Sequence, residues 1–483
     1  MSSTVLPPGI IQESRWARSV GRVDGQLGDL NELVVSVDLK RDMVADAQTM
    51  KEAGVTRGAR IFRLRRVCGR SMVRAEEGML MPQADRDAPA VLTVNAGSSS
   101  VKWALFRVAQ PPVKTETGHI ERIGLPDGIV TVTDPATGRR ERRVAQVSSH
   151  AEAARWLIEH LTESGKGAGI QAIGHRVVHG GSRYADPQVV SAEMIEELRR
   201  LSPYDPEHLP AELALIDALA GQYPQAPQVA CFDTGFHQHL PPVARLMAIP
   251  RRYEKQGVRR YGFHGLSYAY LIEELERVAG REAARGKVIL AHLGNGASMA
   301  AVRDGSSIDT SMGFTPASGL PMSTRSGDVD PGVVSYLART EGLTADQFHH
   351  MVNAQSGLLG ISELSPDLRD LLAQEGHDAH AADAVALLCY QGKKYLGAYA
   401  AALGGVEQVV FSGGIGEHAA VVRARMCEGL EFLGIELDQA RNEANAPIIS
   451  SGQSRVTVRV IRTDEESQIA RSLCRLLALH AGP

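Results

Sequence analysis

The sequence predicts an α/β fold made of two lobes of related design with a cleft between them. A strand, a short turn rich in glycine and serine, and a second strand occur over residues 91–106, and the same arrangement recurs over residues 288–303. Segments with the apolar spacing of helices follow each hairpin, as expected for helices that cover sheets. The length of 483 residues would suggest two or three domains, but the repeated hairpin favours one duplicated architecture.

The elements of this fold can be placed along the chain. We predict strands at Val91–Val94, Val101–Phe106, Gln228–Phe232, Val288–Leu293, Met299–Arg303 and Gln408–Phe411. We predict helices at Ala151–Thr162, Ala192–Leu201, Leu266–Val278, Ala381–Leu403 and Ala419–Phe432.

Composition narrows the class of protein. Hydrophobic residues make up 43% and charged residues 22%, and the net charge is only -4, so nothing indicates a nucleic-acid or anionic-membrane partner. No apolar stretch approaches the roughly 20 residues of a membrane-spanning helix. The five cysteines are widely spaced and odd in number, which argues against disulfides and structural zinc. We expect a cytoplasmic protein.

Residues 1–88 differ from the rest of the chain. They contain a run of basic residues with no acid among them: Arg57, Arg60, Arg63, Arg65, Arg66, Arg70 and Arg74. Such a run is more often a solvated tail than a binding surface. We expect residues 1–88 to be a poorly ordered N-terminal extension without chemistry of its own.

Several polar residues stand where they can bind an anion. The first hairpin turn offers backbone N–H groups, the side chain of Asn95 and the ammonium group of Lys102, all suited to phosphate. Arg176 and Arg325 lie in glycine-rich segments far apart in sequence, and together they can close on a carboxylate or phosphoryl group. Asp233 follows a predicted strand, where carboxylates often bind Mg²⁺ or orient a nucleophile.

Two further motifs have alternative interpretations. His264 lies between glycines, where it can reach a ligand without backbone crowding, although a single histidine is more often structural. The run Gly414-x-Gly416-x-x-Ala419 matches a relaxed dinucleotide fingerprint, and Glu436 lies twenty residues beyond Gly416. An NAD-dependent oxidoreductase is therefore one alternative, although it leaves both arginine segments unexplained.

From about Ala90 onwards the chain resembles the acetate kinase family, within the acetate and sugar kinase/heat-shock/actin superfamily. The matching strings are V-N-A-G-S-S-S-V-K, G-H-R-V-V-H-G-G, F-D-T-G-F-H, R-Y-G-F-H-G, H-L-G-N-G-A-S, D-G-S-S-I-D-T-S-M-G-F-T-P, T-R-S-G-D-V-D-P, S-G-L-L-G-I-S, S-G-G-I-G-E and T-D-E-E. Their number and order make the resemblance specific.

The resemblance implies an actin-like, ribonuclease H-like ATPase fold. Residues 89–235 with 464–483 would form a first lobe on the acetate and phosphate side, and residues 236–463 a second, nucleotide-binding lobe. It also implies a homodimer that transfers a phosphoryl group in line between ATP and acetate, giving acetyl phosphate and ADP, with Mg²⁺ or alternatively Mn²⁺ as cofactor. Such transfer needs alignment and charge neutralisation more than covalent help.

The resemblance also assigns roles residue by residue. It implies a catalytic set of Arg176, Asp233, His264 and Arg325. It implies an acetate pocket lined by Val178, Phe263 and Pro316, with Arg176 on the carboxylate. It implies nucleotide contacts from Lys102, His292, Asn295, Gly296, Asp367, Arg369, Gly414 and Ile415. It implies metal contacts from Asn95 and Glu465.

Some segments depart from the family pattern. Family members usually carry A-P-L-H-N-P where this chain has residues 202–206, so we expect the active-site histidine to be absent there, with Tyr204 or His208 as a partial substitute. The usual T-S-H is Leu266-Ser267-Tyr268 here, and His418, Asp464 and Ser323 are further replacements. These changes leave two alternatives open: a kinase for propionate or another short carboxylate, and a diverged ATP-binding protein with weak activity.

Overall fold

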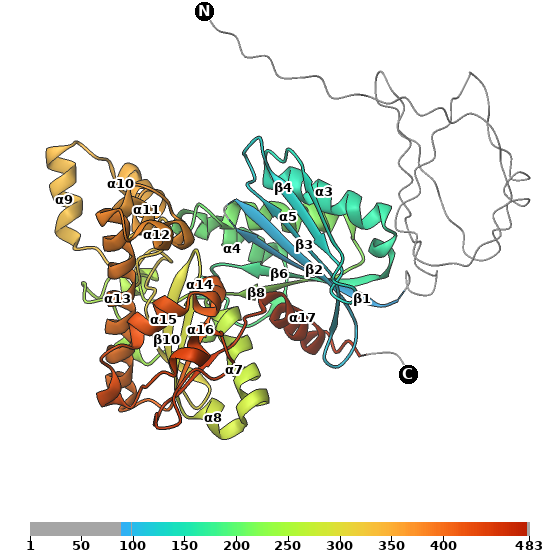
Figure 1. Cartoon of the computed structure of the whole chain (residues 1–483). Helices are drawn as coiled ribbons and strands as arrows, with labels where there is room; N and C mark the ends of the chain where they lie inside the picture. Colours follow the sequence, from blue (N-terminus) through green and yellow to red (C-terminus); the bar gives the residue numbers. More distant parts are fainter. Residues whose placement is uncertain (1–87, 98, 481–483) are drawn as a thin grey trace, which may run out of the picture. The chain divides into compact units, whose positions relative to one another are not determined.

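The computed structural model describes residues 88–97 and 99–480, and these belong to one compact unit, Gln83–Pro483 (Figure 1). The expected extension, with its arginine run, lies outside the described residues. The secondary structure consists of two sheets with helices packed against them, as the sequence predicts.

The first sheet has eight strands in the order β5-β4-β3-β2-β1-β6-β8-β7. Their bounds are β1 Ala90–Gly97, β2 Ser100–Arg107, β3 Val113–Glu121, β4 Ile129–Thr133, β5 Arg140–Val144, β6 Ile170–Val177, β7 Gln188–Val189 and β8 Gln228–Phe232. β1 and β2 form the predicted antiparallel hairpin, while β6 and β8 continue the sheet parallel to β1.

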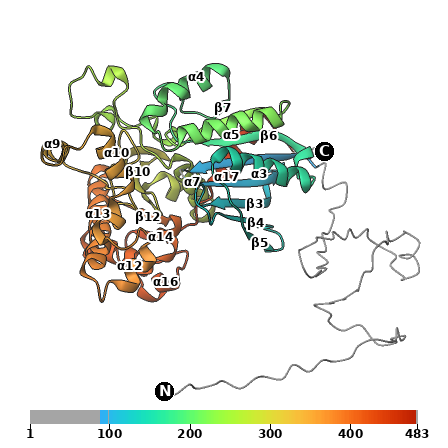
Figure 2. The same ribbon diagram turned by 90° about the horizontal axis from the view of Figure 1, so that it is seen from above.

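Both faces of the first sheet are covered. Leu92 and Val94 point to one face, where they pack with α3 (His150–Glu163) and α5 (Leu209–Gln222). Val91 points to the other face, where α17 (Glu465–Leu476) packs (Figures 1 and 2). A strand buried on both faces reads as a continuous apolar run, which explains why A-V-L-T-V lacks alternation.

The second sheet has five strands in the order β11-β10-β9-β12-β13. Their bounds are β9 Lys287–Leu293, β10 Ala297–Arg303, β11 Ser306–Thr310, β12 Gln408–Ser412 and β13 Thr457–Val460. Helix α7 (Gly265–Ala279) packs on one face through Leu271 and Leu275, and α13 (Ala379–Leu403) packs on the other. α7 also contacts α17, so it lies between elements of both sheets.

The remaining helices surround the second sheet or the first. They are α4 Ala192–Leu201, α6 Pro242–Arg245, α8 Arg281–Arg285, α9 Pro331–Thr340, α10 Ala345–Ala354, α11 Gly357–Ser362, α12 Leu368–Gln374, α14 Gly413–His418, α15 Ala420–Cys427 and α16 Gln439–Glu443. The predicted helix Ala419–Phe432 is wrong in two respects. It ends at Cys427, because the chain turns at Gly429 with a φ of 75°, and the preceding glycine turn is itself the short helix α14.

The strands of the two sheets lie in residues 90–232 and 287–460, and α17 returns to the first sheet. The predicted lobe boundaries stay a prediction, since residues 83–483 group as one unit. The four described cysteines, Cys231, Cys389, Cys427 and Cys474, are buried free thiols. Across the described residues, no helix has both the length and the apolar character needed to cross a membrane.

Candidate active site

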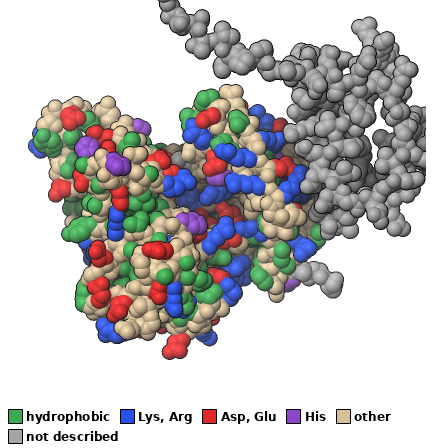
Figure 3. Space-filling model, viewed as in Figure 1, with side chains coloured by type: hydrophobic (Ala, Val, Ile, Leu, Met, Phe, Trp, Pro, Cys, Tyr) green, Lys and Arg blue, Asp and Glu red, His purple; other side chains and the backbone are tan. Residues whose placement is uncertain are grey.

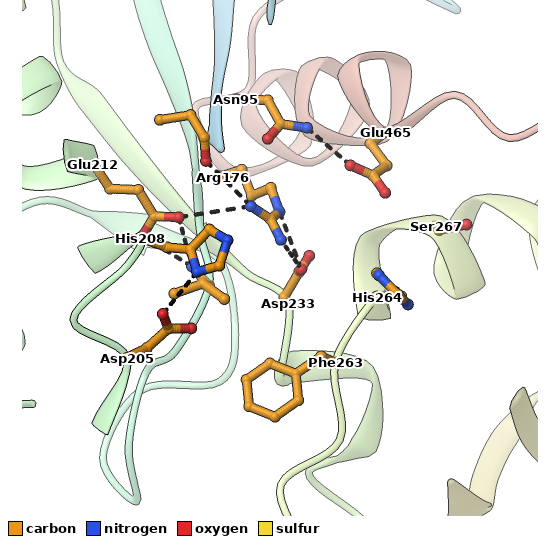
Figure 4. A network of polar contacts seen from close by, with 12 residues as sticks. Asn95, Arg176, Asp205, His208, Glu212, Asp233, Phe263, His264, Ser267 and Glu465 are labelled. Carbon is orange, nitrogen blue, oxygen red and sulfur yellow. Dashed lines mark hydrogen bonds and ion pairs between the residues drawn. The ribbon is translucent and has the colours of Figure 1, made fainter. Parts of the chain in front are cut away.

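Arg176, near the end of β6, is the centre of the site (Figure 4). Its Nε and Nη2 atoms donate to Oδ2 of Asp233 at 3.0 and 2.6 Å, and its Nη1 donates to the carbonyl oxygen of Ala96 at 3.3 Å. β6 and β8 run parallel with Arg176 beside Cys231, so Asp233, just beyond β8, emerges at the same edge of the sheet. The predicted arginine and carboxylate thus form one buried ion pair.

This ion pair is shielded from solvent, since Asp233 is fully buried and the Arg176 side chain is 13% exposed. Burial alone would lower the pKa of Arg176, but the neighbouring carboxylates of Asp233, Glu465 and Glu212 raise it above its ordinary value. Arg176 therefore stays a cation, with one edge of its guanidinium group held by Asp233 and the remaining N–H groups available to a ligand.

Glu212 is a site residue that the sequence analysis missed. It lies on α5, both its oxygens accept from the backbone N–H of Val178 at 3.0 and 3.2 Å, and Oε1 is 3.7 Å from Nη1 of Arg176. Its neighbours on the helix, including Leu213 and Ile216, are buried. In the sequence, the one feature that could have marked Glu212 as a site residue is that it is an acid within an apolar stretch of helix. Burial raises the pKa of Glu212 to about 8, opposed by Arg176 and the Val178 N–H.

The raised pKa of Glu212 predicts a pH-dependent stability. The unfolded chain loses this proton near the ordinary value of 4.5, whereas the folded chain keeps it until about pH 8, so stability falls as the pH rises through that window. Between pH 6 and pH 8 the wild type should lose about 2–3 kcal/mol more free energy of unfolding than Glu212→Gln, which cannot ionise. Urea unfolding at both pH values measures this difference. Glu196→Gln on α4 is the exposed control, and equal pH dependence in Glu212→Gln and wild type would contradict the assignment.

His264 stands at the start of α7 in a left-handed conformation, with a φ of 59°. The next residue, Gly265, donates its N–H to the carbonyl oxygen of Asp233 at 2.8 Å, and a Cβ there would lie 2.2 Å from that oxygen. Only glycine fits this approach, which ties the histidine to the strand-end carboxylate. Gly296 has no side chain, but a Cβ atom placed on it would lie 3.1 Å from Nε2 of His264 and 3.7 Å from Nη1 of Arg325. The backbone of Gly296 therefore lies next to both of these side chains.

His292 stacks on His264 with ring centroids 4.2 Å apart. Its Nδ1 bonds to Oγ of Ser267 at 2.8 Å, and that hydroxyl bonds to Oγ1 of Thr463 at 2.7 Å. Burial lowers the pKa of His292 to about 4, and burial together with the charges of His292 and both arginines lowers the pKa of His264 well below its ordinary value. Both rings are neutral near pH 7, so His264 can donate or accept one hydrogen bond without adding charge.

Arg325 approaches the site from the second arginine segment. Its Nη2 lies 3.4 Å from Nε2 of His208, and among the described residues no carboxylate forms an ion pair with it. Nδ1 of His208 bonds to Oδ1 of Asp205 at 2.7 Å, while Oδ2 of Asp205 is buried without a partner among the described residues. A partly buried guanidinium without a carboxylate partner is suited to an anionic ligand.

His208 is one of the two substitutes that the sequence suggests for the histidine missing from residues 202–206. The fold brings its Nε2 within 3.4 Å of Nη2 of Arg325, and Figure 4 shows His208 with Asp205. Its role as a substitute stays a prediction. Tyr204, the other suggested substitute, instead packs against the rings of Phe314 and His179. The hydrogen bond from His208 to Asp205, three residues earlier, orients the ring of His208.

Asn95, Glu465 and Asp233 fit a divalent cation. Nδ2 of Asn95 donates to Oε2 of Glu465 at 2.8 Å, and Oδ1 of Asp233 is buried without a partner among the described residues. Burial, followed by the charge of Asp233, raises the pKa of Glu465, and a bound cation would relieve that repulsion. No cluster of three His, Cys, Asp or Glu metal ligands occurs in the described chain, but Mg²⁺ commonly needs only one or two carboxylates besides water and phosphate. Lys102 lies on β2 opposite Asn95 and lowers the pKa of Glu465.

The predicted nucleotide residues are only partly brought together. A Cβ on Gly294 would lie 4.0 Å from the backbone N of Gly414, so α14 starts beside the turn that contains Asn295. Ile415 is the third residue of α14. Asp367 caps α12 and pairs with Arg369, whose side chain is 88% exposed. Among the described residues, no hydrogen bond or ion pair joins these two to the other predicted site residues. Their nucleotide role stays a prediction.

The predicted acetate pocket has two members in one core cluster. Val178 and Phe263 are both almost fully buried and belong to the same cluster of apolar side chains. Pro316 is buried as well, and its role in the pocket stays a prediction. On the face shown in Figure 3, acidic, basic and histidine side chains lie close together near the middle of the described part of the molecule.

Comparisons with known proteins agree with this geometry. The profile of the acetokinase family matches residues 90–471. An acetate kinase of Bacillus mycoides is 42% identical over 394 residues, covering 80% of this chain and 98% of the relative. The crystal structure of Porphyromonas gingivalis acetate kinase matches with a TM-score of 0.73 and 38% identity, covering 81% of this chain and 100% of that one. A propionate kinase from Francisella tularensis matches with a TM-score of 0.74 and 35% identity, covering 80% and 98%.

The likeness to these structures confirms the predicted two-sheet α/β fold of the actin-like ATPase type. The family match favours a phosphotransferase over the dinucleotide interpretation of Gly414 and Gly416. The match extends over about four fifths of the chain and nearly the whole length of each relative. The chain belongs to the acetokinase family.

Proposed function

We propose that the chain transfers a phosphoryl group reversibly between ATP and acetate, giving acetyl phosphate and ADP. The observation that carries this proposal is that His264, Arg325 and the backbone of Gly296 meet at one place, and that Arg176 is connected to them through Asp233, whose carbonyl oxygen accepts from the N–H of Gly265 beside His264. Two guanidinium groups and a neutral imidazole can hold a carboxylate next to a phosphoryl group without forming a covalent intermediate. The family membership of the chain supports the same reaction.

In this proposal each residue has a role that follows from its charge and its position. Arg176 and Arg325 bind the carboxylate and the migrating phosphoryl group, and they neutralise the charge that spreads over its oxygens during in-line transfer. His264 donates a hydrogen bond to a phosphoryl oxygen, and Asn295 with Gly296 binds phosphate. Because water would compete as an acceptor, the residues that exclude it, such as Phe263, are as important as those that bind.

Asn95, Asp233 and Glu465 would hold Mg²⁺, or Mn²⁺ in its place. When bound, the cation neutralises phosphate oxygens and fixes their orientation. ATP lies on the side of the second sheet in this proposal. The residues proposed to bind it are Lys102, His292, Asn295, Gly296, Asp367, Arg369, Gly414 and Ile415.

Propionate is a second candidate substrate. The similar structure from Francisella tularensis is a propionate kinase, and an apolar pocket discriminates one methylene by only about 1–3 kcal/mol. Val178, Phe263 and Pro316 are proposed to line this pocket. Acetate remains the first choice, because the family and the similar curated relatives are acetate kinases.

Trapping the acyl phosphate tests the proposal directly. The full chain is incubated with ATP, Mg²⁺, hydroxylamine and acetate, propionate or butyrate, and the hydroxamate is measured. We expect hydroxamate with acetate at least as fast as with propionate. Arg183→Ala, a half-exposed arginine that pairs with Glu197, serves as a control that keeps activity. No hydroxamate with any acid, together with thermal stabilisation by ATP, would instead identify a diverged ATP-binding protein, and stabilisation by NAD alone an oxidoreductase.

We also propose that the chain acts as a cytoplasmic homodimer. α9 contains no buried residue, and its apolar side chains Val334 and Tyr336 are 40% and 62% exposed. An apolar helix face that solvent reaches in one copy is suited to pack against a second copy. The mass of the particle in solution, measured by light scattering, decides between one copy and two.

A further inference from the structure

We propose that Tyr268, acting through Ser298, holds His264 in the tautomer that carries its proton on Nε2. Tyr268 is thus a positioning residue, and it touches no substrate. The inference rests on the proposed function for the role of His264 in catalysis, but its geometry stands on contacts of the chain alone. It is also specific to this chain, in which Leu266-Ser267-Tyr268 replaces the T-S-H run of the resembling family.

The three side chains form one continuous line of hydrogen bonds. Tyr268 lies one helical turn after His264 on α7, and its backbone N–H donates to the His264 carbonyl oxygen at 3.0 Å. Its hydroxyl oxygen is 2.5 Å from Oγ of Ser298 on β10, and that Oγ is 2.8 Å from Nδ1 of His264. Tyr268 and Ser298 are fully buried, so solvent does not compete for these bonds.

Counting protons along this line fixes the direction of each bond. Burial raises the pKa of the Tyr268 phenol above its ordinary value, so the hydroxyl keeps its single proton. Among the described side chains, Oγ of Ser298 is its hydrogen-bond partner, and it therefore accepts that proton. Oγ of Ser298 could also accept a second bond from Nδ1–H, but its own buried hydrogen would then have no side-chain acceptor among the described residues. The arrangement that satisfies every proton has the serine hydroxyl donate to Nδ1 of His264. A neutral imidazole that accepts at Nδ1 must carry its proton at Nε2.

The proton on Nε2 points to the place where the phosphoryl group is proposed to lie. Nε2 of His264 faces the backbone of Gly296 and the guanidinium group of Arg325. With the proton there, the ring donates to an anionic oxygen, whereas the opposite tautomer would present a lone pair and repel it. A phenol at residue 268 favours one direction, because it keeps an O–H whose side-chain partner among the described residues is Ser298, whereas a neutral histidine could offer either an N–H or a lone pair.

Nitrogen NMR of the histidine rings tests the tautomer without any need for activity. The full chain is labelled with ¹⁵N-histidine, and the His264 signals are assigned by their loss in His264→Gln. We expect the Nε2-protonated pattern in the wild type and a mixture of tautomers in Tyr268→Phe. In the hydroxamate assay, kcat of Tyr268→Phe should fall roughly tenfold, the size of one hydrogen bond, with KM for ATP and acetate nearly unchanged.

A double-mutant cycle shows whether Tyr268 acts through Ser298. Ser298→Ala should lose as much kcat as Tyr268→Phe combined with Ser298→Ala, because the second change removes nothing further. Tyr399→Phe is the matched control: this phenol is also buried, lies on α13 and has no hydrogen-bond partner among the described residues. It should keep the wild-type kcat and the wild-type His264 pattern.

The outcomes separate this inference from the proposed function. An Nδ1-protonated His264 in the wild type would overturn the inference, as would an unchanged His264 pattern in Tyr268→Phe. Additive losses in the cycle would also overturn it, since they indicate a general packing role. If the wild type formed no hydroxamate yet showed the Nε2-protonated pattern and its loss in Tyr268→Phe, the inference would stand and the proposed function would fail.

Discussion

Replacing Arg325 with alanine should lower kcat for acetyl phosphate formation by roughly a thousandfold or more, with little change in the midpoint of thermal unfolding. An arginine that neutralises a migrating phosphoryl group typically contributes factors of about 10³ to 10⁵. Arg325 forms no ion pair among the described residues and is only 3.4 Å from His208, so its charge is free for the reactants. Burial lowers its pKa, which implies that the empty site gains little from holding this cation.

Two further variants sharpen this result. Arg325→Lys keeps the charge but loses the planar fork of donors, and it should recover only part of the activity. Arg339→Ala, an exposed arginine on α9, should behave as the wild type. Hydroxamate formation and thermal unfolding are measured on all three. A loss of less than tenfold in Arg325→Ala would contradict a role in the transition state.

Replacing Asp233 with asparagine should abolish most activity and also destabilise the fold, unlike the change at Arg325. Oδ2 of Asp233 accepts from two nitrogens of Arg176, and both side chains are buried. Removing one partner leaves a buried unpaired charge, which costs about 3–5 kcal/mol. The loss of activity should reach roughly a hundredfold, because a displaced Arg176 no longer aligns the carboxylate. The amide also has one oxygen where the carboxylate has two, so it cannot both accept from Arg176 and offer an oxygen to the proposed cation.

Urea unfolding measures the stability of Asp233→Asn, and the hydroxamate assay measures its activity. Asp217→Asn is a matched control on α5, because Asp217 is 58% exposed and pairs with Arg199 at the surface. It should change the free energy of unfolding by less than about 1 kcal/mol. Retained stability in Asp233→Asn would mean that Glu212, the other carboxylate beside Arg176, compensates for the lost charge.

Local patterns were sufficient to predict much of the fold. The strand pairs around residues 95–100 and 294–297 and the long helix Ala379–Leu403 follow from short-range apolar spacing and glycine turns. The helix predicted over Ala419–Phe432 was too long, because periodicity persists after Gly429 has already turned the backbone. Periodicity records which side chains are apolar, and it does not record where the backbone bends.

The residues of the candidate site were also predictable only in part. Arg176, Asp233, His264 and Arg325 stand in glycine-rich or strand-end contexts that mark them in the sequence. Glu212 lies within an apolar stretch of helix, where an acid carries no local sign of function. Glu212 belongs to the site because α5 packs against β6, which brings the carboxyl oxygens of Glu212 to the backbone N–H of Val178.

The sequence by itself determined the fold class, the hairpins and the family resemblance, because each depends on residues close together in the chain. Only the tertiary structure decided which polar groups share a proton or a charge. His208 is paired with Asp205 and Arg325, and Tyr268 is joined to His264 through Ser298, across separate elements of the chain. The pKa of a buried group and the tautomer of a histidine depend on neighbours within a few ångströms, and folding alone chooses those neighbours.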